Sequence, residues 1–129
     1  MIKLAEKLKV PQELMPMCDY YSLIIKGPIL FLGALESFSQ NQGFSVDYHN
    51  CEFSHEMHPL EEEYFTDGVR FTIDISRAYE SEVIVTFETF YKYLLKVSDI
   101  YLEMHPQDSQ EVKKFLNDIH SNLILNQVL

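Results

Sequence analysis

Four side chains that are able to bind a metal ion fall within ten residues of one another: His49, Cys51, His55 and His58. Zinc takes Cys and His ligands in tetrahedral sets, usually as two tight pairs that a longer loop separates. Here the pairs are His-x-Cys and His-x-x-His, with only three residues between them. That spacing matches no common zinc finger or zinc ribbon. The pattern therefore predicts surface histidines and a small buried thiol, and no metal site.

The same cluster contains the residue types of a nucleophilic enzyme. A thiol becomes a nucleophile when a positioned histidine activates it, and the chain offers Cys51 with five histidines but no motif that joins them. Acidic residues are so abundant that pairs of them indicate little about acid–base catalysis. The four glycines stand singly, so no phosphate-binding loop is present. We therefore expect no catalytic residue and no cofactor.

Carboxylates and tyrosines concentrate in the middle of the chain, where they form a second candidate site. An acidic surface of this kind can dock a basic protein, and aromatic residues such as Tyr64 and Tyr79 are typical anchors of an interface. The alternative is a solvated loop and hairpin rim. The predicted partner-binding residues are Glu61, Glu62, Glu63, Tyr64, Asp67, Asp74, Tyr79, Glu80 and Glu82.

The elements that would position these residues begin with a predicted β-hairpin at about residues 69–86. Apolar and polar side chains alternate from Val69 to Ile75, which is typical of a strand with one face toward water. A polar, turn-like segment follows, and the β-branched residues 83–85 favour a second, antiparallel strand.

Two helices are predicted after the hairpin, at about residues 87–105 and 109–124. Thr86 can serve as the N-cap of the first helix, and Pro106 ends it. Residues 108–111 have the pattern of a capping box before the second helix. Four apolar residues recur at spacings of four, three and four and so share one face of the first helix: Phe90, Leu94, Val97 and Tyr101.

The N-terminal half is less regular. A short amphipathic helix is expected over residues 2–9, residues 20–25 fit a strand or a helical turn, and a helix is expected from Pro28 to about Gln40, with Gly43 as its stop. Residues 44–48 alternate as in a strand, which would need a bulge near residue 50 to continue. We predict one compact α+β domain over residues 1–129, with a small antiparallel sheet packed by helices.

Composition narrows the classes of partner. The net charge of −10 disfavours direct binding to nucleic acid, which needs clustered Lys and Arg, and it favours basic proteins. The N-terminus lacks the uninterrupted apolar region of a secretory signal, and no apolar run is long enough for a membrane span. A cytoplasmic protein is expected. Two free thiols are favoured there over a single disulfide between Cys18 and Cys51.

The last half of the chain carries three structural markers. They are D-G-V-x-F at residues 67–71, F-x-x-Y-L at residues 90–94, and Y-x-x-x-H-P-x-D at residues 101–108. In these markers the chain resembles immunity proteins of bacterial contact-dependent growth inhibition systems, in the group that neutralises ribonuclease toxins. The resemblance implies a monomer that binds the C-terminal nuclease domain of a cognate toxin one-to-one and occludes its active site.

Two other classes of function stay open at this stage. The chain could be a small cytosolic enzyme that uses Cys51 and nearby histidines, in which case a concave pocket should surround that thiol. It could also be a non-catalytic adaptor whose exposed sheet edge pairs with itself or with a partner strand.

Overall fold

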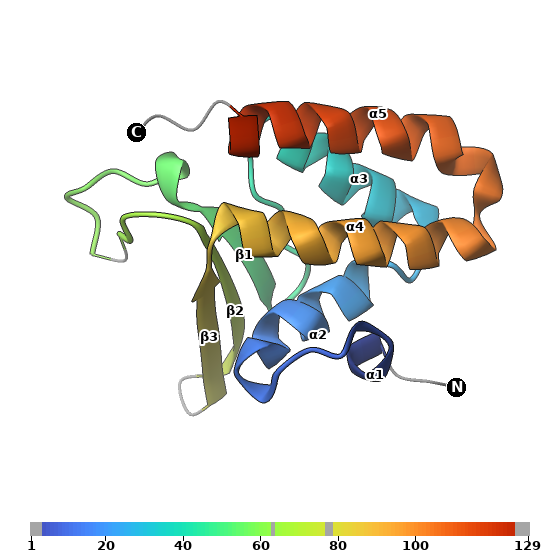
Figure 1. The fold of residues 1–129 in the computed structure, drawn as a ribbon. Coiled ribbons are helices and arrows are strands. Elements are labelled where there is room, and N and C mark those ends of the chain that lie inside the picture. The colour runs from blue at the N-terminus through green and yellow to red at the C-terminus, as the bar shows by residue number, and fades with distance from the viewer. Residues whose placement is uncertain (1–3, 63, 77–78, 126–129) are drawn as a thin grey trace.

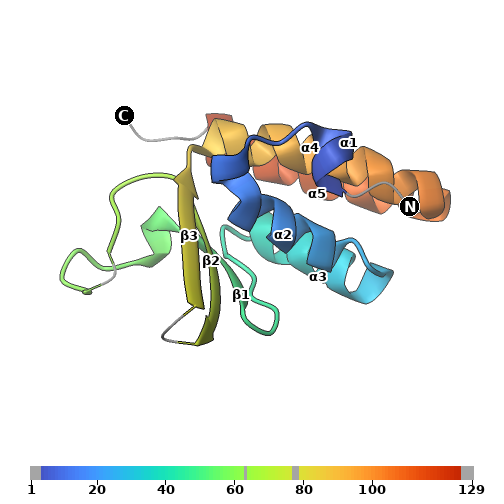
Figure 2. The same cartoon turned by 90° about the horizontal axis from the view of Figure 1, so that it is seen from below.

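The computed structural model describes residues 4–62, 64–76 and 79–125 (Figure 1). A three-stranded antiparallel sheet stands on one side of a group of helices, as Figures 1 and 2 both show. The strands are β1 (His49–Phe53), β2 (Val69–Ser76) and β3 (Tyr79–Val85), in the order β1-β2-β3. The helices are α1 (Leu4–Leu8), α2 (Met15–Ile24), α3 (Pro28–Ser39), α4 (Phe87–Met104) and α5 (Ser109–Ile119). The predicted α+β class is confirmed.

The predicted hairpin is present as β2 and β3. Its pairing runs from Val69 opposite Val85 to Ser76 opposite Tyr79, with one irregularity between Asp74 and Ser76. The alternation in β2 separates two faces, because Val69 and Phe71 are fully buried against the helices while Asp74 is exposed on the other side. One face of the sheet therefore belongs to the core, and the other face is turned away from it.

The predicted strand at residues 44–48 is wrong. The structure places β1 at His49–Phe53, and the chain before it folds back, with Val46 and His49 exchanging two backbone hydrogen bonds of 2.9 and 2.8 Å. Asp47 lies in the left-handed region of backbone conformation, at φ 52°. The chain therefore makes a tight turn at Asp47, where the sequence predicted a strand that continues through a bulge.

Helix α4 follows its apolar period closely. Thr86 is its N-cap, and its side chain accepts a hydrogen bond from the Thr89 N–H at 3.0 Å. The helix ends at Met104, and Pro106 opens the short turn that leads into α5. A π-helical turn, His120–Leu125, extends the second predicted helix. The predicted capping box before α5 is wrong, because Asp108 instead accepts a hydrogen bond of 2.6 Å from the Tyr101 hydroxyl.

The N-terminal half is helical where its sequence was ambiguous. Residues 20–24 belong to α2, which contains Pro16 in its first turn, where a missing N–H costs nothing. Pro28 opens α3 as predicted. The helix stops at Ser39, and Asn41 rather than Gly43 takes the left-handed conformation after it, at φ 63°.

Aromatic side chains fill the space between the sheet and the helices. The Tyr21 hydroxyl donates to the Phe90 carbonyl at 2.9 Å, and Phe31 stacks on Tyr101 with ring centroids 4.2 Å apart. Phe53 packs edge-on against Phe90. This core joins α2, α3 and α4 to β1 and β2. Among the described residues, no helix is long and apolar enough to cross a membrane.

Candidate functional site

The face of the sheet that turns away from the helices is hollowed. Cross-strand pairing places Glu52, Arg70 and Ile84 in one row, and Asn50, Thr72 and Glu82 in the next. The segment between β1 and β2 closes one side through Tyr64 and Phe65. We call this hollow, of about 540 Å³, the sheet-face concavity. The described residues that line it are Asn50, Glu52, Glu62, Tyr64, Phe65, Arg70, Thr72, Ile73, Asp74, Glu82 and Ile84.

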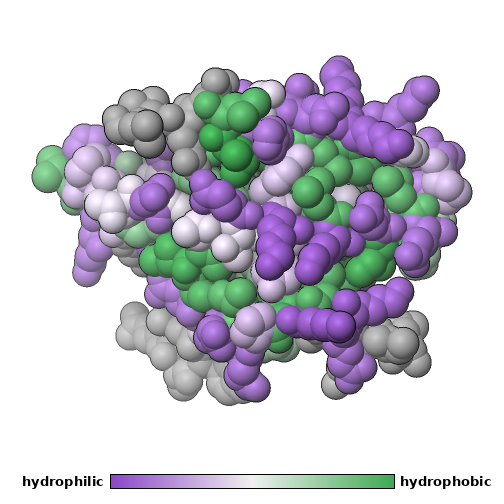
Figure 3. Space-filling model, in the orientation of Figure 1, coloured by the Kyte–Doolittle hydropathy of each residue, from purple (hydrophilic) through white to green (hydrophobic). Residues whose placement is uncertain are grey.

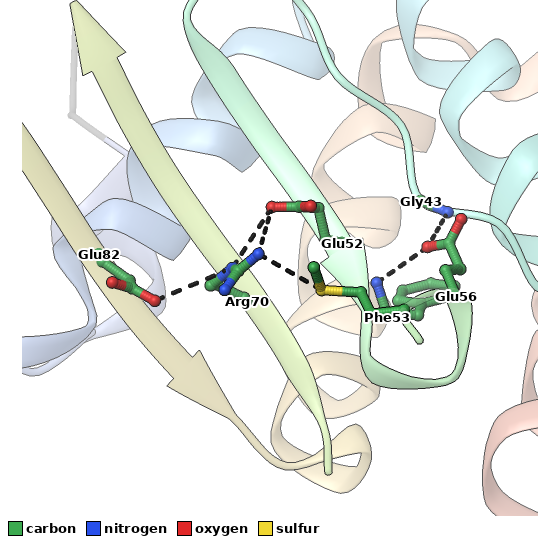
Figure 4. A network of polar contacts seen from close by, with 7 residues as sticks. Gly43, Glu52, Phe53, Glu56, Arg70 and Glu82 are labelled. Atoms are coloured by element: carbon green, nitrogen blue, oxygen red, sulfur yellow. Dashed lines mark hydrogen bonds and ion pairs between the residues drawn. The ribbon is translucent and has the colours of Figure 1, made fainter. Parts of the chain in front are cut away.

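Arg70 holds the parts of the concavity together (Figure 4). Its Nε and Nη2 donate to Oε1 of Glu52 on β1, at 3.3 and 3.1 Å, and its Nε lies 3.8 Å from Oε1 of Glu82 on β3. Its guanidinium carbon lies 4.7 Å from the ring centroid of Phe65, and Nη2 contacts Sδ of Met57 at 3.5 Å. One arginine thus connects three strands with the β1–β2 segment.

The concavity is electrically asymmetric. Four of its described lining residues are carboxylates, Glu52, Glu62, Asp74 and Glu82, and Arg70 is the one cation among them. Arg70 is only 7 % exposed, whereas the side chains of Glu52 and Glu82 are 36 % and 51 % exposed. The guanidinium therefore lies below the carboxylates, and the surface that a partner would meet is predominantly negative.

A further carboxylate, Glu56, has a structural role beside this site (Figure 4). Its Oε1 accepts hydrogen bonds from the backbone N–H groups of Gly43 and Phe53, both at 2.9 Å. These bonds tie the turn that follows β1 to the segment that precedes it. Glu56 thereby fixes the point at which the β1–β2 segment leaves the sheet.

The structure assembles part of the predicted binding set. Glu62, Tyr64, Asp74 and Glu82 line the concavity. Glu61 and Asp67 are exposed on the β1–β2 segment outside that lining, and Oε1 of Glu61 accepts from the nearby His58 N–H at 3.3 Å. Glu63 lies outside the described residues. Tyr79 and Glu80 belong to β3, and their side chains are also outside the description.

The predicted binding set did not include four residues that also line this site: Glu52, Phe65, Arg70 and Ile84. A signal for Glu52 existed, because it alternates with the apolar residues Cys51 and Phe53 and so had to point away from the core. The cross-strand register, which places Glu52 beside Arg70, cannot be obtained from either strand alone.

The histidine and cysteine cluster is dispersed. Cys51 is 1 % exposed on the inner face of the sheet, while Nε2 of His55 lies 2.7 Å from the Asn41 carbonyl oxygen and His58 is exposed. Within the described residues, no group of three or more His, Cys, Asp or Glu side chains is arranged to hold a metal ion.

The geometry around Cys51 does not fit an activated nucleophile. Burial raises the pKa of the Cys51 thiol well above its ordinary value, and the nearby carboxylates of Glu56 and Glu52 raise that pKa further. A reactive cysteine needs the opposite environment, an electropositive and partly exposed one that favours the thiolate. Both Cys18 and Cys51 are buried free thiols, and burial raises the pKa of Cys18 as well.

The markers noted in the sequence lie in the last half of the chain, and comparison with known proteins finds a match over a longer part of it. A family model described as CDI immunity protein matches residues 11–116. The matched region includes α2, α3, all three strands, α4 and most of α5. No curated protein matches the chain.

Proposed function

The chain belongs to the CDI immunity protein family, and from this premise we propose that it binds the ribonuclease domain of a cognate contact-dependent growth inhibition toxin and neutralises it. The partner is the C-terminal nuclease domain of that toxin. The complex contains one copy of each protein and forms in the cytoplasm of the cell that makes both. Family membership is the observation that carries this proposal.

The charge of the chain supports a nuclease as the partner. A ribonuclease holds the RNA phosphates with Lys and Arg side chains, so its substrate groove is positive. A protein of net charge −10 is attracted to such a groove and is itself repelled by RNA. The same electrostatics that bring RNA to the toxin thus bring this chain to it.

Neutralisation by occlusion requires no catalysis by this chain. A standard protein interface covers about 800 Å² on each partner, which is enough to close a nuclease active site. Carboxylates placed over the cationic groove take the positions of RNA phosphates, and RNA is displaced. The mechanism is therefore stoichiometric, and protection ends when toxin exceeds immunity protein.

The test is a titration of the nuclease domain of the cognate toxin with this chain. Cleavage of RNA is expected to fall linearly with added protein and to stop at one equivalent, and calorimetry is expected to give a one-to-one complex of nanomolar affinity. Undiminished cleavage at a tenfold excess would contradict the proposal. A non-cleavable RNA analogue distinguishes occlusion from binding elsewhere, because only occlusion makes the analogue and this chain compete.

A further inference from the structure

We propose that the sheet-face concavity is the surface that receives the toxin, and that its occupant is an exposed toxin segment that inserts an arginine or lysine side chain. This inference rests on the proposed function and specifies the place and the chemistry of docking. It concerns an unpartnered sheet face, which family membership alone does not identify.

The concavity retains unused capacity to accept hydrogen bonds. Both Arg70 nitrogens that contact Glu52 bind the same oxygen, Oε1, and Oε2 of Glu52 has no hydrogen bond within the described residues. Glu82 meets Arg70 only through a contact of 3.8 Å, which is longer than a hydrogen bond. Asp74 and Glu62 are exposed at the rim. An incoming guanidinium or ammonium group finds several acceptors that Arg70 does not satisfy.

The apolar part of the lining fits the rest of such a side chain. Ile84 is 47 % exposed on the edge strand β3, directly opposite Arg70 on β2. Tyr64 stands half-buried in the wall. Arginine and lysine bury their aliphatic stems on surfaces of this kind while the charged end stays near polar groups. The volume of about 540 Å³ lies within the range of pockets that hold small ligands.

A second hollow, on the helical side, lacks this selectivity. It lies along α4 and beside the turn His120–Leu125, and its lining includes Leu95 and Ile124. Its charged residues are Lys92 and Lys96 against Glu88 and Asp99, so neither sign dominates. Figure 3 views the side that carries α4 and α5, where apolar atoms lie among hydrophilic ones. Charge complementarity to a basic toxin therefore favours the sheet face.

Two double variants with equal change in net charge test the inference. Asp74→Asn with Glu82→Gln removes two carboxylates from the concavity, and Glu36→Gln with Asp118→Asn removes two exposed carboxylates from α3 and α5. Calorimetry with the toxin domain is expected to show a dissociation constant raised at least about 30-fold for the first pair and less than about threefold for the second. Urea unfolding of each variant verifies that the fold is kept.

The outcomes separate this inference from the proposed function. If the wild type neutralises the toxin and the two pairs weaken binding equally, or neither weakens it, the proposed function stands and the concavity is not the docking surface. If the wild type does not bind the toxin, the proposed function fails and toxin docking at the concavity fails with it. Whether the concavity binds a cationic side chain is then decided by a probe that needs no toxin.

That probe is a tri-arginine peptide, titrated at low salt into the isotopically labelled full chain. Amide shifts are expected at Glu52, Thr72 and Glu82 in the wild type and in the Glu36→Gln/Asp118→Asn variant, and not in the Asp74→Asn/Glu82→Gln variant. Shifts spread evenly over the surface would overturn the inference. A dimer in sedimentation equilibrium that these sheet-face substitutions dissociate would also overturn it, because a second copy of the chain would then cover the face.

Discussion

Arg70 occupies a strand position where the alternation of side chains predicts exposure, and yet it is 7 % exposed. Asp74, four residues further along β2 and on the same face, is exposed as the alternation predicts. The difference arises from the β1–β2 segment, which lays Phe65 over the guanidinium and Met57 beside it. Contacts of this kind join residues five to thirteen positions apart through a loop, and local periodicity contains no information about them.

We predict that Arg70→Met destabilises the fold by about 2 kcal/mol. Removing one partner of a buried ion pair costs about 3–5 kcal/mol, and the cost here is smaller because Glu52 and Glu82 are partly exposed and can take up water. Arg70→Lys, which keeps the charge and loses the planar fork, should lie between the wild type and Arg70→Met. Urea unfolding measures all three, and equal midpoints would show that the network contributes no stability.

The buried thiol of Cys51 predicts a loss of stability in alkali. Its pKa is raised well above the ordinary value in the folded chain, so the thiol stays protonated there while an unfolded chain ionises above about pH 8.5. The unfolded state then binds fewer protons, and the free energy of unfolding falls as pH rises, by up to about 1.4 kcal/mol per pH unit.

The measurement compares the wild type with Cys51→Ala by urea unfolding at pH 7.5, 8.5 and 9.5. Tyrosines, which begin to ionise in the unfolded chain toward their pKa of about 10, are the same in both proteins and their contribution cancels. Between the extremes the wild type should lose about 1 kcal/mol more than the variant. Cys18 is present in both proteins and its contribution cancels. Parallel pH profiles would mean that the Cys51 thiol ionises equally in the folded and unfolded chain.

At the scale of elements, the parts that follow a single local period were predictable from the sequence. The β2–β3 hairpin and α4 agree with their patterns of two and 3.6 residues, because each buries one face against the core. The predictions failed where a distant group competes for a local one. Asp108 bonds to Tyr101 instead of capping α5, and the turn at Asp47 pairs residue 46 with β1.

The start of β2 depends on Gly68, and we predict that Gly68→Ala destabilises the sheet by about 2 kcal/mol or more. The residue has φ +100°, and an added Cβ would lie 2.2 Å from the Val85 carbonyl oxygen of β3. Gly33→Ala is the matched control, since its Cβ would meet Phe44 at an ordinary 3.6 Å inside helix α3. The control should be neutral or stabilised by up to about 1 kcal/mol. Equal urea midpoints for the two variants would refute the argument.

At the scale of the whole molecule, the sequence indicated the sign of the candidate site better than its outline. The negative middle of the chain was visible in composition. Of the six predicted residues whose side chains the structure describes, four line the concavity: Glu62, Tyr64, Asp74 and Glu82. Its floor was not predictable, because Glu52, Arg70 and Ile84 meet only through the register of three strands. The charge of the site can be read from its residues, whereas its concave shape depends on how the strands pair and on where the β1–β2 segment lies.

Because the chain has a net charge of −10, we predict that the rate at which it associates with the toxin depends on salt. If the toxin groove is basic, long-range attraction speeds the encounter, and raising NaCl from 0.05 to 0.5 M should lower the association rate constant at least about tenfold. The dissociation rate constant should change less than about threefold, because contacts inside the interface are screened weakly. Stopped-flow mixing of the chain with the toxin domain measures both constants.

The two double variants divide these effects between the field and the contact. Each removes two negative charges, so both should slow association by a similar factor at low salt. Only Asp74→Asn/Glu82→Gln should also speed dissociation, since only these carboxylates touch the partner in the proposed complex. An association rate that is independent of salt would show that charge does not guide the encounter. A faster dissociation of Glu36→Gln/Asp118→Asn would instead place the contact on the helical layer, where α3 and α5 lie side by side.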